Sequence, residues 1–202
     1  TSIGNRAFRI ASDLNSITFG ENSQLTSIGT SAFHEAKKLT SINIPDSVTS
    51  IGPLGFYFTT GLTSITFGAN SQLTTIGYSA FQGTGLTSIT IPSSVTSIGN
   101  NAFITATSLT SITFGPNSLI NSMGNNKVFL NTTSLTTLYL TDNLTFGGTT
   151  YTIGTSRTFF GSSTISLEQS PLSSFTDTNN VSYIIDISGE LTEASYTSGG
   201  LT

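Results

Sequence analysis

The chain has 202 residues, enough for one or two domains, and 36% of them are hydrophobic, which excludes a disordered chain. Six basic against ten acidic residues give a formal net charge of −4, too few cations to neutralise a row of phosphates, so we expect no nucleic-acid partner. There is no cysteine, which excludes a disulfide framework and a thiolate metal site, and no apolar run long enough for a membrane-spanning helix.

A repeated unit runs through most of the chain. Residues 1–13 match the second half of a copy, so we expect the chain to continue upstream or this edge to pack on a neighbour. Phe-Gly and Ile-Pro alternate after the first apolar run of successive units, which suggests a period of about two units. Complete copies of 23–26 residues open at Leu14, Leu39, Leu62, Leu86 and Leu109, and a degenerate copy opens at Leu135.

Each unit predicts two short strands. In the third complete copy a Thr-rich apolar run over 62–67 ends at Gly68, and a second run over 73–76 ends at Gly77. One unit buries too little apolar surface to offset its chain entropy, so the units must stack into a solenoid. The predicted core positions of this unit are Leu62, Ile65, Phe67, Leu73, Ile76, Ala80 and Phe81.

The motif L-T-S-I-T-I-P-x-S-V-T-S-I-G-x-x-A-F, best matched over residues 86–103, resembles the BspA-like leucine-rich repeats, also called the Treponema pallidum type. The resemblance implies a curved or twisted, mostly β, right-handed solenoid. It also implies a surface or secreted protein of a bacterium, a parasitic protist or a large virus, associated with adhesion. The family usually carries cysteine three residues after the phenylalanine, where this chain has Ala11, Ala36, Thr59, Thr84 and Ala106.

We expect two parts: a leucine-rich solenoid over residues 1–164, and a C-terminal β segment over 165–202 that is a cap or the start of another module. All the charges of the second part are acidic, but their spacing fits no calcium loop, so we predict no metal and no cofactor. These acidic residues are Glu168, Asp177, Asp186, Glu190 and Glu193.

The residues that alternate with the buried positions of each first strand should point outward on one sheet face. Stacked strands would make a flat ladder of hydroxyls, which is either a recognition face or simply the small β-forming residues that a regular sheet needs. The predicted binding residues are Ser16, Thr18, Ser41, Asn43, Ser64, Thr66, Ser88, Thr90, Ser111, Thr113, Thr137 and Tyr139.

Charge is scarce along the solenoid: between Lys38 and Lys127 the only charged side chain is Asp46. This composition favours an extracellular, cell-surface or particle-surface protein. We interpret the chain as a non-enzymatic module for adhesion or for contact with a protein or glycan on another surface. The main alternative is a building block of a filament, fibre or viral capsid, in contact with neighbouring subunits. Ice binding is a weaker alternative. The Thr-rich flat ladder suggests it, but the outward pairs are mostly Ser with Thr, which argues against it.

Two other features could carry chemistry. His34 is the only histidine, and because other units place unrelated residues at its position we interpret it as a solvated loop residue and predict no catalytic residues. Three Asn-x-Ser/Thr sequons would be glycosylated only in a host that modifies them, and they begin at Asn131, Asn143 and Asn180.

Overall fold

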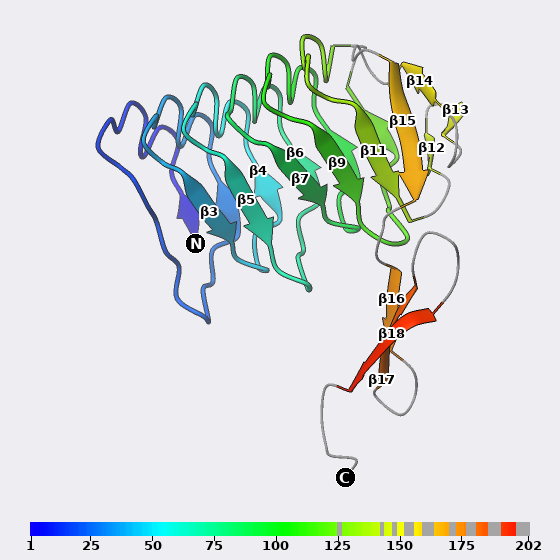
Figure 1. The fold of residues 1–202 in the computed structure, drawn as a ribbon. Helices are drawn as coiled ribbons and strands as arrows, with labels where there is room; N and C mark the ends of the chain where they lie inside the picture. Colours follow the sequence, from blue (N-terminus) through cyan, green and yellow to red (C-terminus); the bar gives the residue numbers. More distant parts are fainter. Residues whose placement is uncertain are drawn as a thin grey trace.

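The computed structural model describes residues 1–124 and 127–141, and beyond them the backbone of seven strands between residues 144 and 196. The chain winds into a β solenoid, and the described residues include no helix (Figure 1). Successive coils stack side by side, so that equivalent residues of neighbouring units lie next to one another. This confirms the predicted repeat solenoid.

The second apolar run of each unit forms one side of the solenoid. Its strands are two residues long and pair in parallel, with serine or threonine aligned on serine and isoleucine or methionine on isoleucine. They form a six-stranded sheet in the order β1-β2-β4-β6-β8-β10. The strands are β1 (Ser2–Ile3), β2 (Ser27–Ile28), β4 (Ser50–Ile51), β6 (Thr75–Ile76), β8 (Ser97–Ile98) and β10 (Ser122–Met123).

The first apolar run of the later units forms a second side, in two separate sheets whose repeat strands pair in parallel. One pairs β3 (Ser41–Ile44) with β5 (Ser64–Phe67). The other has the order β14-β15-β11-β9-β7, in which β15 pairs in parallel with β11 and β14 pairs antiparallel with β15. Its strands are β7 (Ser88–Ile91), β9 (Ser111–Phe114), β11 (Thr137–Leu140), β14 (Ser156–Thr158) and β15 (Thr164–Gln169).

The first complete unit departs from the prediction. Residues 14–19 form no strand, although their sequence matches the first strand of later units. The backbone contact with the next coil is one long hydrogen bond, donated by Thr40 N–H to Asn15 C=O at 3.5 Å. A strand needs a regular series of such bonds, so this segment follows the solenoid without joining a sheet.

The Ala-Phe segments form the third side, and their phenyl rings make a continuous stack inside the solenoid. Neighbouring ring centroids lie 5.0–5.4 Å apart and the ring planes differ by 6–17°. Five of the six rings are fully buried, and the ring of the first coil is half-buried. The stack consists of Phe8, Phe33, Phe56, Phe81, Phe103 and Phe129.

The backbone of the third side is unusual. In each of the first five coils two residues adopt left-handed φ values, such as Ser31 at 56° and Glu35 at 56°, and only Gly83 among them is a glycine. This geometry aims alternate N–H groups at the next coil. In the second coil Ser31, Phe33 and Glu35 donate to carbonyls of the third at 2.9, 2.7 and 2.8 Å. These bonds help to offset the cost of left-handed L-residues, about 1–2 kcal/mol each.

The core matches the predicted positions with one exception. In the unit that opens at Leu62, six of the seven predicted residues are buried, and Phe67 is half-buried. The position where the family usually carries cysteine is also inside. Thr59 is fully buried, and its Oγ1 donates to the Phe33 carbonyl at 2.7 Å. A threonine is therefore accepted there because its hydroxyl finds a backbone partner.

The remaining strands lie after residue 141. β12 (Leu144–Phe146) and β13 (Thr149–Tyr151) form a hairpin pair. β16 (Ser173–Thr176), β17 (Val181–Ile185) and β18 (Leu191–Tyr196) form an antiparallel sheet of their own. The expected division at residue 164 stays a prediction. Among the described residues no helix is long and apolar enough to cross a membrane.

Candidate functional site

The outward residues of the first strands form what we call the ladder face. Within each sheet they lie in register: Ser41 beside Ser64 and Asn43 beside Thr66 in one, and Ser88, Ser111 and Thr137 beside one another in the other. The other row of the larger sheet consists of Thr90, Thr113 and Tyr139. The outward residues of β3, β5 and β7 are exposed, and those of β9 and β11 are half-buried.

The ladder face is not continuous. Ser16 and Thr18 lie in the segment that forms no strand, so the structure does not align them with the later rungs. A second interruption separates β5 from β7, which belong to different sheets. The two strands approach where they begin, with Thr87 N–H donating to Thr63 C=O at 3.4 Å. The sequence gives no sign of this break, because both units carry the same L-T-S-I-T run.

Single rungs are expected to matter little for stability. Thr66 and Thr90 are exposed, and the Thr66 hydroxyl makes one hydrogen bond, to Asn43 Oδ1 at 3.0 Å. Thr66→Ala and Thr90→Ala should each change the free energy of unfolding by less than about 0.5 kcal/mol, as at most surface positions. Urea denaturation of the two variants checks this. A loss above about 1 kcal/mol at either site would mean that the hydroxyl supports the fold.

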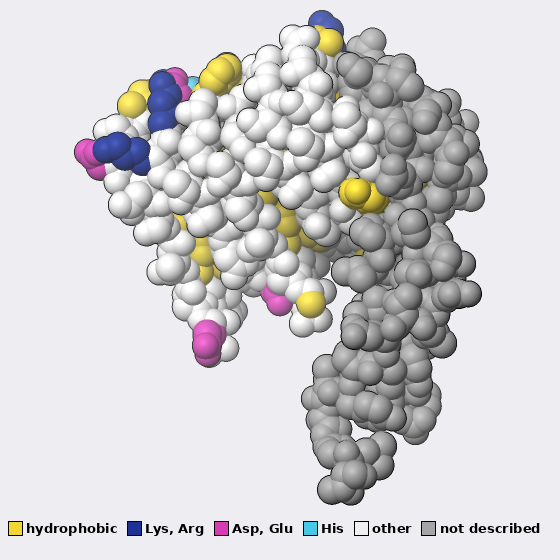
Figure 2. All heavy atoms as spheres, in the orientation of Figure 1, with side chains coloured by type: hydrophobic (Ala, Val, Ile, Leu, Met, Phe, Trp, Pro, Cys, Tyr) yellow, Lys and Arg dark blue, Asp and Glu magenta, His cyan; other side chains and the backbone are white. Residues whose placement is uncertain are grey.

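Two hollows open where the first strands end, at the edge of the ladder face. The first hollow, of about 660 Å³, lies over the Pro45 turn, between the 19–24 turn and Gly68 and Gln72 of the coil after. The second hollow, of about 400 Å³, lies over the Pro92 turn, between residues 67–71 and Gly115–Pro116. Figure 2 shows apolar side chains recessed between ridges along this edge. The hollows arise because each Ile-Pro turn is flanked by two Phe-Gly turns.

The two hollows are built alike. Ser47 and Ser94, one residue before the buried valine of each Ile-Pro turn, donate their hydroxyls to carbonyls of the coil before at 2.8–2.9 Å. The following Phe-Gly turn is held in the same way both times: Gln72 N–H donates to Asp46 C=O, and Leu119 N–H to Ser93 C=O, each at 2.9 Å. The alternation seen in the sequence therefore has a structural counterpart, a hollow that recurs every two coils.

The linings differ in charge. Glu21 and Asp46 line the first hollow, and at the equivalent positions Ala69 and Ser93 line the second. No lysine or arginine lines either hollow. Each hollow contains one half-buried phenylalanine, Phe19 or Phe67. Sequence reasoning placed Phe67 in the core and did not predict the hollows, although they recur with the same two-unit alternation of Phe-Gly and Ile-Pro turns.

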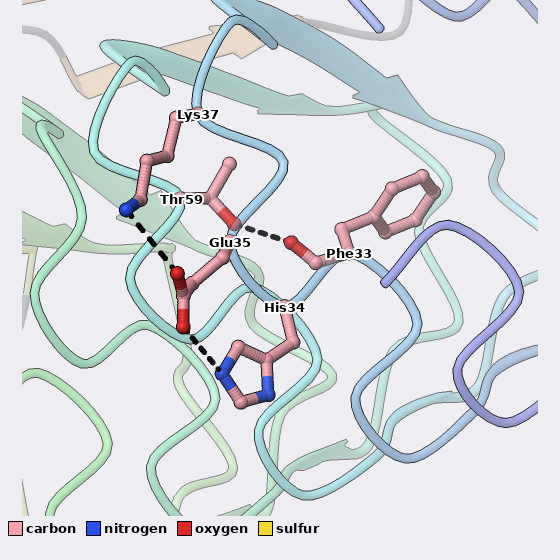
Figure 3. Close-up of polar contacts among 5 residues, drawn as sticks. All are labelled: Phe33, His34, Glu35, Lys37 and Thr59. Atoms are coloured by element: carbon pink, nitrogen blue, oxygen red, sulfur yellow. Dashed lines mark hydrogen bonds and ion pairs between the residues drawn. The ribbon is translucent and has the colours of Figure 1, made fainter. Parts of the chain in front are cut away.

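His34 lies on the third side, away from the ladder face, in a small polar cluster (Figure 3). Its Nε2 is 3.3 Å from Glu35 Oε1, while Lys37 Nζ is 3.2 Å from Glu35 Oε2. The Tyr57 ring meets the imidazole edge-on at 4.8 Å. Lys37, and after it His34, hold the pKa of Glu35 below its ordinary value. Carboxylate and aromatic ring hold the imidazole, and the His34 side chain is only 15% exposed, so the expectation of a solvated loop residue was wrong.

Charged side chains gather at one end of the solenoid. Figure 2 shows mostly neutral polar surface over the later coils, with Lys and Arg concentrated near the first ones. Lys38 pairs with Asp13 at 2.8 Å across the first two coils. Among the described residues no group of His, Asp and Glu could hold a metal ion. The sequon residue Asn131 is exposed in a turn, whereas Asn143, Asn180 and the acidic side chains after residue 164 lie outside the described residues.

The chain is similar to proteins of known structure. Among proteins of curated function, none shows significant similarity to this sequence. A Bacteroides ovatus leucine-rich repeat protein is 26% identical with a TM-score of 0.58, over 68% of this chain and 34% of its own. The T. pallidum leucine-rich repeat protein is 24% identical with a TM-score of 0.55, over 62% of this chain and 58% of its own.

The chain thus spans about a third of one of these structures and just over half of the other. The model of the BspA-type leucine-rich repeat region matches six copies in two overlapping stretches, residues 1–72 and 26–152. Together these stretches cover residues 1–152, well over half of the chain. The chain therefore belongs to the BspA-type leucine-rich repeat family.

Proposed function

We propose that this chain is a non-enzymatic, surface-exposed interaction module that contacts a protein or glycan on another surface through its ladder face. Membership of a repeat family whose members present extended regular surfaces supports binding in general. The observation that carries the proposal is the set of in-register rows over β7, β9 and β11, which place hydroxyl groups at a fixed spacing on a nearly uncharged surface. The scarcity of charge on the solenoid supports an extracellular location.

A ladder of neutral hydroxyls binds through many weak contacts, so its test needs several simultaneous changes. The variant Thr66→Glu/Thr90→Glu/Thr113→Glu puts three carboxylates on neighbouring coils of the ladder face. Each would have to be desolvated against a partner, which costs several kcal/mol when unpaired. We expect this triple variant to bind immobilised mucin and fibronectin at least a hundred-fold more weakly than the unmodified chain does in surface plasmon resonance.

The matched control carries the same charge elsewhere. Thr49→Glu/Thr75→Glu/Thr96→Glu places three carboxylates beside the second-strand sheet and should leave binding within about two-fold, since changes away from a binding surface are close to neutral. Binding that survives the ladder-face variant but is lost on deletion of residues 170–202 would contradict the proposal and place the site in the C-terminal segment. This deletion keeps β15, which pairs with β11.

A further inference from the structure

We propose that the two hollows together bind a neutral, linear β-1,4-linked glycan, with one pair of sugars for every two coils. The inference rests on the proposed function, because Thr66 and Thr90 of the ladder face line the second hollow. It assigns the specific contact to the edge where the strands end. The hydroxyl rows then extend this contact across the sheet.

The linings suit a neutral sugar. Small-ligand sites are concave and largely apolar, with a few polar groups that fix orientation. Each hollow offers one half-buried phenyl ring, Phe19 or Phe67, beside a proline, Pro45 or Pro92. Such apolar rings stack against the C–H face of a pyranose, while hydroxyl and amide groups can both donate to and accept from its hydroxyls.

The charges that line the hollows narrow the class of glycan that could bind. No lysine or arginine lines either hollow, and the first hollow carries Glu21 and Asp46. Uronic-acid or sulfated chains would meet like charge there and find no cation in return, so they are disfavoured. Asn22, Gln24, Asn43 and Gln72 add neutral amide groups to the first hollow. A neutral polysaccharide is the ligand class that this lining accommodates.

The distance between the two hollows favours a β-1,4 linkage between the sugars. Neighbouring coils lie 5.0–5.4 Å apart at the phenyl stack, so hollows centred two coils apart repeat at twice that distance, roughly 10 Å. This is close to the length of two sugars in an extended β-1,4-linked chain. Consecutive sugars of such a chain are flipped, so the same face recurs at every second sugar. One straight chain can therefore present equivalent faces to Phe19 and Phe67 together.

Calorimetric titration of the full chain with cellobiose and cellohexaose tests the idea. A ligand that reaches both hollows gains from the effective concentration of the second contact. We expect cellohexaose to bind at least ten-fold more tightly than cellobiose. Maltohexaose, an α-linked chain that coils, should bind no more tightly than cellobiose. Equal affinity for the short and long β-linked chains, or no binding of either, would overturn the inference.

Three matched substitutions locate the contact. Phe19→Leu and Phe67→Leu each remove the ring from one hollow and should each bring cellohexaose affinity down to the level of cellobiose. Phe114→Leu is the control, because Phe114 follows the same repeat position but is buried and lines neither hollow. It should leave affinity within two-fold. Equal loss in all three variants would show that affinity follows stability and would overturn the assignment.

The outcomes also separate this inference from the proposed function. Binding of mucin or fibronectin that is lost in the ladder-face variant, together with no binding of cellohexaose, leaves the proposed function standing and rejects the glycan. If the unmodified chain binds neither mucin or fibronectin nor cellohexaose, both the proposed function and the glycan inference are rejected. Thermal unfolding of each variant, followed by circular dichroism, confirms that the comparison is made between folded proteins.

Discussion

Phe81→Ala is expected to lower the free energy of unfolding by about 3–5 kcal/mol, the usual cost of truncating a fully buried phenylalanine. The Phe81 ring stacks between Phe56 at 5.4 Å and Phe103 at 5.3 Å, and none of its surface is exposed. Its removal opens a cavity in the middle of the stack, where neighbouring coils are held at a fixed distance by backbone hydrogen bonds. Urea denaturation followed by circular dichroism measures the loss.

Leu119→Ala is the control for this truncation. Leu119 is also a large apolar residue, but 62% of its surface is exposed. Its replacement should change the free energy of unfolding by less than about 0.5 kcal/mol. A cost below about 1 kcal/mol for Phe81→Ala would mean that the phenyl stack does not hold the coils together.

Gly99→Ala is expected to destabilise the solenoid by about 1–3 kcal/mol or more, the cost of overpacking a close-packed region. Glycine directly follows each of the six strands of the second-strand sheet. A Cβ at Gly99 would lie 2.6 Å from Tyr78 N and 2.7 Å from Gly77 C, both in the backbone of the coil before. Backbone atoms cannot rotate away as a side chain can. The added methyl group must therefore push the two coils apart.

Gly4 provides a matched control for Gly99. It follows β1 at the same repeat position, but a Cβ there would meet nothing within 4 Å. Gly4→Ala should therefore change the midpoint of urea unfolding very little, whereas Gly99→Ala should lower it clearly. Equal effects of the two substitutions would mean that glycine is needed for its backbone conformation and not for the close approach of the coils.

The local pattern predicted the solenoid well because every unit repeats the same solution. Ile65, Leu73, Ile76, Ala80 and Phe81 were assigned to the core by their spacing, and all are buried. Each coil meets a near copy of itself, so a residue that fits one position fits its neighbour. For this reason the family resemblance and the stacking of the coils were both accessible from sequence.

The features that could not be predicted from the sequence depend on contacts between coils that are not identical. The break between β5 and β7 and the half-buried state of Phe67 follow no local signal, since Phe114 at the same position is buried and its strand pairs on both sides. The twelve ladder residues stay a predicted site, and the structure aligns ten of them in strands. The left-handed residues escaped notice because side chains such as Leu54 and Ser79 seldom adopt that conformation.

The hydrogen bonds of the third side also give that side an electrical polarity. Every described bond between its coils there runs from an N–H of one coil to a carbonyl of the next, as from Phe8 to Ala32. Aligned peptide dipoles add, as they do in an α-helix, but here the carbonyl end faces the first coil. Four of the six basic residues, Arg6, Arg9, Lys37 and Lys38, belong to the first two coils. The bonds between coils on the other two sides run the opposite way, as from Gly29 N–H to the Ile3 carbonyl, so this dipole belongs to the third side alone. The basic residues lie near its negative end, and the favourable interaction should weaken as salt screens it.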